Sequence, residues 1–194
     1  MILGKQVYIA HMKTVFCISV FFCEKTCVFE FYFVTLHVRK LSLKSFIKNI
    51  QTLMQSDPKQ CLYCTNNQTL HDLMIEICEL SVSRAFLFKE QTYRGRCLVA
   101  YNGHVNDLNE LTDEQRNAFM SDVARVTRAM QKAFNPEKIN YGAYSDKLSH
   151  LHFHLAPKYV DGPDYGGTFQ MNPGKVYLTD AEYAQMIEQI KANL

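Results

Sequence analysis

The chain has 194 residues, enough for one well-buried domain with or without an extension. Its formal net charge of +2 hides a split, because residues 1–55 carry seven basic and two acidic side chains, whereas the rest carry 14 basic and 17 acidic ones. The larger part is therefore slightly acidic, which gives no indication of a nucleic-acid partner. The cysteines, seven in all, do not form a secreted disulfide pattern, so we expect a reducing, cytoplasmic setting.

Residues 1–54 differ in composition from the rest of the chain. They hold seven of the 13 phenylalanines, a single glycine and no proline. Their most apolar stretch, residues 15–23, is too short to span a membrane, which takes about 20 residues. Two interpretations remain: a genuine extra strand pair or membrane-leaning arm, or sequence translated upstream of the true start. We favour the second, because Met54 opens an ordinary polar stretch. We expect residues 1–54 to be a weakly ordered or non-native extension of a domain over residues 55–194.

From residue 55 onward, apolar residues recur with the periods of both strands and helices, which is typical of an α+β fold. Strands are expected at residues 73–80, 82–88, 96–101, 139–144 and 150–158, with the last two paired antiparallel through a polar turn. One helix is expected from a capping box at residues 112–115 to about residue 134, and a shorter one from a capping box at residues 179–182.

Residues 150–156 alternate strictly between histidine and apolar side chains until the final alanine. Successive side chains of a strand point to opposite faces, so this period predicts that His150, His152 and His154 share one face. Three imidazoles together indicate metal binding, or nucleophilic and acid–base chemistry near neutral pH. A solvated edge strand with histidines by chance is the alternative.

Together with other residues, this run resembles the histidine triad (HIT) family. The supporting residues are Asn140 and Gly142 before the run, a cysteine pair at Cys61 and Cys64, and His104 about 40 residues later. The resemblance extends from about residue 61 to residue 172. It implies an α+β fold with a five-stranded antiparallel sheet and two helices, usually a homodimer. It also implies a protein that binds nucleotides and cleaves or transfers nucleoside monophosphates.

The resemblance also implies roles for individual residues. His152 would be the nucleophile that attacks the α-phosphorus of a dinucleoside polyphosphate or nucleoside phosphoramidate, giving a nucleotidyl-histidine intermediate that water releases. One ring nitrogen of His152 must then be held as a donor, by a backbone carbonyl, so that the other is free to attack. His154 and backbone N–H groups would stabilise the phosphoryl charge. Asn140 would support the ribose–phosphate site, unless it is an ordinary strand-edge amide.

Cys61, Cys64, His104 and His150 resemble the ligand set of zinc-containing members of this family. Two thiolates and two imidazoles would close a tetrahedral site, which is structural rather than catalytic. A redox-active cysteine pair and two unligated thiols are the alternatives. We expect a structural zinc ion and no stable membrane span.

The chain departs from the family pattern in three places. Many members carry a Gly-Gln-Ser-like stretch before the triad, which helps the leaving group, whereas residues 145–149 differ here. Lys147 in that stretch would neutralise a polyphosphate leaving group, or is an ordinary turn lysine. Many members also have a histidine ahead of the third strand, where this chain has Arg96. The acidic residue expected at the ribose hydroxyls has Glu90 as its nearest candidate.

Three functions are consistent with these residues, and we rank an enzyme acting through His152 first. The second is a zinc-stabilised nucleotide-binding module with little turnover, which the altered stretch before the triad favours. The third has His150, His152 and His154 sharing one metal ion. It ranks last because same-face neighbours on a strand are about 7 Å apart, which strains a three-histidine site, and because it leaves the cysteine pair without a role.

Overall fold

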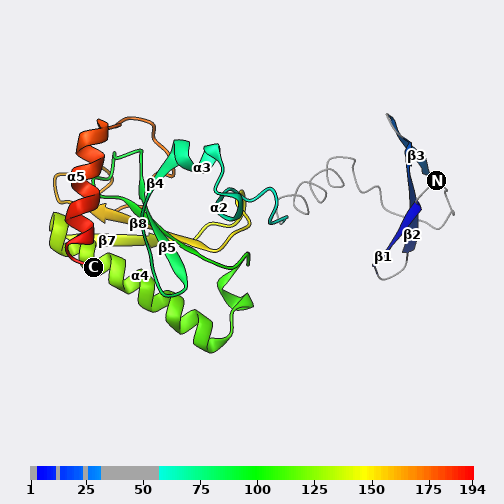
Figure 1. Cartoon of the computed structure of the whole chain (residues 1–194), viewed down its shortest axis with the longest axis horizontal. Coiled ribbons are helices and arrows are strands. Elements are labelled where there is room, and N and C mark those ends of the chain that lie inside the picture. Colours follow the sequence, from blue (N-terminus) through cyan, green and yellow to red (C-terminus); the bar gives the residue numbers. More distant parts are fainter. Residues whose placement is uncertain (1–3, 12–13, 24–25, 32–56) are drawn as a thin grey trace. The chain divides into compact units, whose positions relative to one another are not determined.

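The computed structural model describes residues 4–11, 14–23, 26–31 and 57–194 of the chain, which divides into two units, Met1–Asn49 and Ile50–Leu194 (Figure 1). In the first unit, β1 (Gly4–His11), β2 (Thr14–Cys23) and β3 (Thr26–Phe31) form an antiparallel sheet in the order β1-β2-β3. The sequence suggested that this segment is weakly ordered or translated upstream of the true start. The described residues do not test that interpretation. None of the helices in the described ranges is long and apolar enough to cross a membrane.

The second unit contains the predicted five-stranded antiparallel sheet. Its strands are β4 (Met74–Glu79), β5 (Ser83–Phe88), β6 (Cys97–Tyr101), β7 (Lys138–Gly142) and β8 (His152–Lys158). Their order is β4-β5-β6-β8-β7, so the last strand in sequence lies between β6 and β7. The predicted α+β class and the antiparallel pairing of the last two strands are confirmed.

The start of the triad strand differs from the sequence prediction, because β8 begins at His152 rather than at His150. The loop after β6 holds the preceding residues instead. Leu151 N–H donates to the Val105 carbonyl at 2.7 Å, and Tyr101 N–H donates to the Leu151 carbonyl at 3.0 Å. His150 is therefore fixed beside the end of β6 rather than in the β7–β8 ladder.

The two predicted helices are present as α4 (Asp113–Phe134) and α5 (Asp180–Lys191), each opened by a capping box at Thr112 or Thr179. Three short elements were not predicted: α2 (Leu62–Thr65), α3 (Gln68–Leu73) and the 3₁₀ turn η1 (Leu108–Glu110). The predicted strand from residue 73 starts at Met74, because Asn67 caps α3 and the helix extends to Leu73.

The sheet separates two apolar layers. On one face, Val99 and Leu155 pack against α4 and α5 in the larger core. The other face carries His152 and His154, since residues opposite one another in neighbouring strands share a face. Residues of α2 and α3 cover part of this second face, including Tyr63 and Leu70. We refer to the second face as the histidine face.

Asp122 on α4 fixes the turn between β4 and β5. Its buried carboxylate accepts hydrogen bonds from the Ser81 N–H (3.3 Å) and hydroxyl (2.8 Å), the Val82 N–H (3.0 Å) and the Ser83 hydroxyl (2.7 Å). Four donors satisfy a carboxylate that would otherwise be costly to bury. The longest helix is thereby attached to the edge of the sheet.

After β8 the chain returns over the histidine face as a strap, which we define as residues 164–171. The Tyr93 hydroxyl donates to Asp164 Oδ2 at 2.5 Å and accepts from the Gln170 N–H at 2.7 Å. The buried Lys158 donates to the Asp164 carbonyl at 2.6 Å. Phe169 lies against His154, with ring centroids 6.2 Å apart. The strap is thus fixed at both ends beside the triad.

Candidate active site and metal cluster

All three histidines of the 150–154 run are buried, and their hydrogen-bond partners determine which ring nitrogen carries the proton. A carbonyl only accepts, so His150 donates through Nε2 to the Tyr101 carbonyl (2.8 Å), and His152 donates through Nδ1 to the His150 carbonyl (2.6 Å). A guanidinium only donates, so His154 Nδ1 accepts from Arg96 Nη2 at 3.0 Å. His152 Nε2 therefore has its lone pair available, and His154 Nε2 carries a proton.

Burial keeps these imidazoles neutral. Loss of solvation lowers the pKa of His152 and of His154, and lowers that of His150 to about 4. The Tyr63 ring contributes to this burial, with centroids 4.8 Å from His150 and 5.3 Å from His152. Near pH 7 the imidazole of His152 is unprotonated at Nε2, which is the form that can act as a nucleophile.

The four residues predicted as metal ligands lie together, with all their ligand atoms within 4.8 Å of one another. Cys61 Sγ is 3.4 Å from His150 Nδ1, Cys64 Sγ is 3.3 Å from His104 Nδ1 and 3.6 Å from His150 Nδ1, and the two histidine Nδ1 atoms are 3.4 Å apart. A tetrahedral zinc ion with bonds of about 2.0–2.3 Å puts neighbouring ligand atoms about 3.3–3.8 Å apart. The four separations given above match that spacing.

The hydrogen bonding of the cluster also suits a cation. Because His150 Nε2–H is bonded to the Tyr101 carbonyl, its Nδ1 lone pair points among the two thiols and His104. Burial and the neighbouring Cys61 raise the pKa of Cys64 to about 11, so the thiolate form needs a compensating positive charge. The residues present can therefore hold a divalent metal that prefers sulfur and nitrogen.

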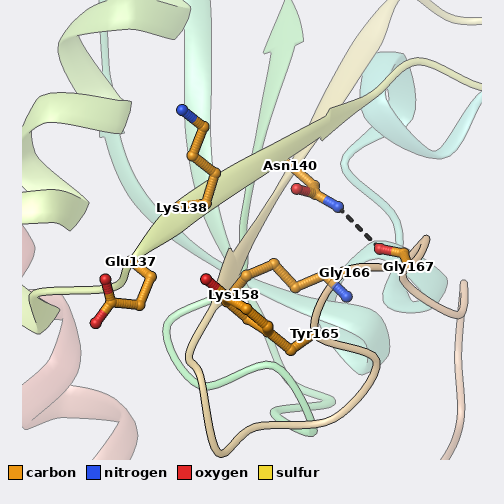
Figure 2. A pocket seen from close by; sticks show the side chains of 7 residues that line it. All are labelled: Glu137, Lys138, Asn140, Lys158, Tyr165, Gly166 and Gly167. Atoms are coloured by element: carbon orange, nitrogen blue, oxygen red, sulfur yellow. Dashed lines mark hydrogen bonds between the residues drawn. The ribbon is translucent and has the colours of Figure 1, made fainter.

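Asn140 lies on β7 opposite Ala156 of β8. Ala156 and His154 are two positions apart on β8, so they share a face and are separated by about 7 Å. Its side-chain amide donates to the Gly167 carbonyl at 3.3 Å. Figure 2 shows Asn140 at the edge of a pocket of about 360 Å³ that Lys138, Lys158 and the Gly166–Gly167 turn also line. Asn140 thus shares the face of the sheet that carries His154, but the pocket that it lines is not lined by the triad histidines.

Two predicted substrate-binding residues lie apart from this arrangement. Lys147 is exposed in the loop between β7 and β8. Glu90 is buried, and its Oε1 accepts from Thr92 and from the N–H groups of Lys175 (3.1 Å) and Val176 (3.3 Å). Glu90 Oε1 thus secures the segment before α5, whereas its buried Oε2 has no hydrogen-bond partner, and a contact of Glu90 with the ribose stays a prediction.

Arg96 lies at the site, but the sequence analysis assigned it no role. In the sequence it stands only as a departure from the family pattern, yet its guanidinium is fully buried against His154. The available signal was its position in the period-two series with Leu98 and Ala100, which pair with His154 and His152. A charged residue whose position places it on the buried face of a strand indicates that a specific polar partner lies beside it.

Comparison with known proteins identifies the fold and the motif. A family model for the HIT domain matches residues 75–161. Residues 75–161 thus match the HIT domain, and the three histidines at positions 150, 152 and 154 lie inside the matched range. Adenosine 5'-monophosphoramidase hnt1 of Schizosaccharomyces pombe is 29% identical over 89 residues, which cover 43% of this chain and 64% of that protein. The chain spans just under two thirds of the length of the curated relatives it matches.

Solved structures of histidine triad proteins share the fold. One from Sinorhizobium meliloti 1021 has a TM-score of 0.61 at 20% identity, over 66% of this chain and 95% of that one. A zinc-bound family protein from Mycobacterium smegmatis has a TM-score of 0.52 at 20% identity, over 70% of this chain and 96% of that one. The five-stranded antiparallel sheet with its helices is therefore the fold of the HIT domain.

Proposed function

We propose that the protein is a nucleotide hydrolase or nucleotidyl transferase that cleaves at the α-phosphate through His152. The observation that carries the proposal is the fixed proton on His152 Nδ1, which leaves Nε2 as a neutral nucleophile next to His154. Nucleoside phosphoramidates and dinucleoside polyphosphates are the substrate classes. The phosphoramidase activity in the name of the fission-yeast relative supports the first of them.

In the proposed reaction, His152 Nε2 attacks the α-phosphorus and forms a nitrogen–phosphorus bond. The bond to the leaving group breaks, and the leaving group departs with the bonding pair and takes a proton from solvent. Water then attacks the nucleotidyl-histidine and releases a nucleoside monophosphate, which restores His152. His154 Nε2–H donates to a phosphoryl oxygen as its charge grows. Asn140 contributes to the ribose–phosphate end of the site.

We further propose a structural zinc ion held by Cys61, Cys64, His104 and His150. The support is the tetrahedral spacing of their ligand atoms and the zinc-bound relative from Mycobacterium smegmatis. When bound, zinc supplies a cross-link between the α2 region and the residue that precedes the triad strand. His152 is outside the ligand set, so the reaction itself does not pass through the metal. A cytoplasmic homodimer is the assembly we expect.

The alternative is a zinc-stabilised nucleotide-binding module with little turnover. The near-complete burial of His152, at 3% exposure, favours it, because a nucleophile must meet the substrate. Nucleotide binding without release of monophosphate by the wild-type protein would favour this alternative over the enzyme.

The deciding experiment measures monophosphate release from adenosine 5'-phosphoramidate and from a diadenosine polyphosphate. His152→Ala should lower the rate by several orders of magnitude while nucleoside monophosphate still binds, since a nucleophile is removed rather than a ground-state contact. His71→Ala, on the exposed His71 of α3, is the matched control and should keep the wild-type rate. A His152→Ala protein that retains more than a few per cent of the rate contradicts the proposal.

A further inference from the structure

Arg96 is a buried cation that makes no close ion pair, although the buried Glu90 carboxylate acts on its charge from farther away. Its side chain is fully buried just before β6, and within residues 57–194 no ion pair involves it. Burial lowers its pKa to about 10, so the guanidinium is still protonated at neutral pH. A buried charge is costly unless polar contacts compensate for the lost solvation, so the contacts of the guanidinium indicate what this residue does.

The histidine face and the strap hold the two terminal nitrogens of the guanidinium, whereas its buried Nε has no hydrogen-bond partner. It lies between the rings of Phe88 and Phe169, 4.5 Å and 4.9 Å from their centroids. Nη1 donates to the backbone carbonyl of Met171 at 2.7 Å and to that of Gln170 at 3.3 Å. Aromatic faces and carbonyl oxygens stabilise a cation and hold the plane of the fork. Nη2 then has two contacts, a weak one to Met171 Sδ at 3.5 Å and a shorter one on the histidine face.

The shorter of the two Nη2 contacts is to His154. Nη2 donates to His154 Nδ1 at 3.0 Å, and since a guanidinium always donates, Nδ1 cannot carry the ring proton while this contact exists. The proton must then be on Nε2. A neutral imidazole without such a partner distributes its proton between the two nitrogens, so Arg96 removes one of two states that His154 would otherwise populate.

We propose that Arg96 is a positioning residue, which holds His154 as an Nε2–H donor toward the phosphoryl oxygen of the substrate. This inference rests on the proposed function of the triad. The strap takes part, because the carbonyls of Gln170 and Met171 orient the guanidinium that orients His154. Residues 170–171 are thereby coupled to the chemistry without touching the substrate.

The test compares Arg96→Met with Arg94→Met as the matched control, since Arg94 is exposed two residues away. Long-range ¹H–¹⁵N spectra of the side chains report which nitrogen of His154 is protonated. Wild type and Arg94→Met should show an unprotonated Nδ1, whereas Arg96→Met should show a mixture of tautomers. Release of monophosphate should fall about 10- to 100-fold in kcat for Arg96→Met, with a small change in KM, because orientation is lost rather than binding.

Arg96→Lys keeps a buried donor near His154, so it should retain the Nδ1-acceptor spectrum and recover part of kcat. If Arg96→Met does not fold, the Arg96→Lys variant is compared with the wild type instead. An unchanged His154 spectrum in Arg96→Met, or a wild-type kcat in a variant whose His154 spectrum has changed, overturns the proposal. If the wild-type protein releases no monophosphate, the proposed function fails instead, while the spectra still show whether Arg96 fixes the tautomer.

Discussion

At the scale of single residues, three neighbouring histidines acquire three different roles from the chemistry of their partners. The Tyr101 carbonyl, the His150 carbonyl and Arg96 each bind a different ring and fix its proton. As a result, the lone pair of His150 lies at the metal cluster, that of His152 is available for attack, and His154 is a donor. The difference between the three imidazoles results from their hydrogen bonds, since the three side chains are chemically identical.

Zinc content tests the cluster directly. Purified protein should contain about one zinc ion per chain, and Cys61→Ser with Cys64→Ser should lose it, because thiolates supply two of four ligands. Chelation should lower the melting temperature first and activity only as a consequence. Cys78→Ser is the control, since Cys78 is a free cysteine outside the cluster, and it should keep its zinc. Wild-type zinc content in the double variant would place the metal elsewhere.

The residues that the sequence predicted best are those that match the motifs of the family that the chain resembles. The cysteine pair, His104 and His150 converge as expected. Arg96 and Glu90 show the limit of such prediction, because their roles depend on contacts with residues 170–176, which are about 75 or more positions away in the chain. The residues of the cluster are equally far apart in the chain but match a family motif, whereas no motif marked the partners of Arg96 and Glu90.

At the scale of elements, the attachment of α4 to the β4–β5 turn depends on Asp122. Asp122→Ala should lower the free energy of unfolding by about 2–4 kcal/mol, because it leaves four donors without their acceptor. Asp113→Ala on the same helix is the control. Its exposed ion pair with Arg116 should contribute less than about 1 kcal/mol. Equal losses in urea unfolding for the two variants would show that the buried carboxylate has no special role.

Element types were predictable where periodicity and capping agreed. The capping boxes at Thr112 and Thr179 open the two long helices as predicted. Boundaries set by tertiary contacts were not predictable, as at His150, where the loop after β6 displaces the strand start by two residues. The short helices α2 and α3 have too few turns for their period to show in the sequence.

At the scale of the whole molecule, the boundary near residue 54 remains a prediction. A protein that starts at Met54 should be soluble and dimeric, with the melting temperature and activity of the full chain, because the five-stranded sheet and both its apolar layers are made from later residues. Thermal unfolding, gel filtration and the release assay compare the two lengths. Precipitation or unfolding of the shorter protein alone would mean that residues 1–53 belong to the fold.

The position of β8 in the sheet has a consequence for biosynthesis. A ribosome delivers β4, β5 and β6, then α4 and β7, before the strand that pairs with both β6 and β7. Until residues 152–158 emerge, the nascent chain has an open strand edge along β6, and such edges attract other chains. Closing that edge is the same event that brings His152 and His154 into place. Formation of β8 therefore closes the β6 edge and places the histidines of the candidate site in one step.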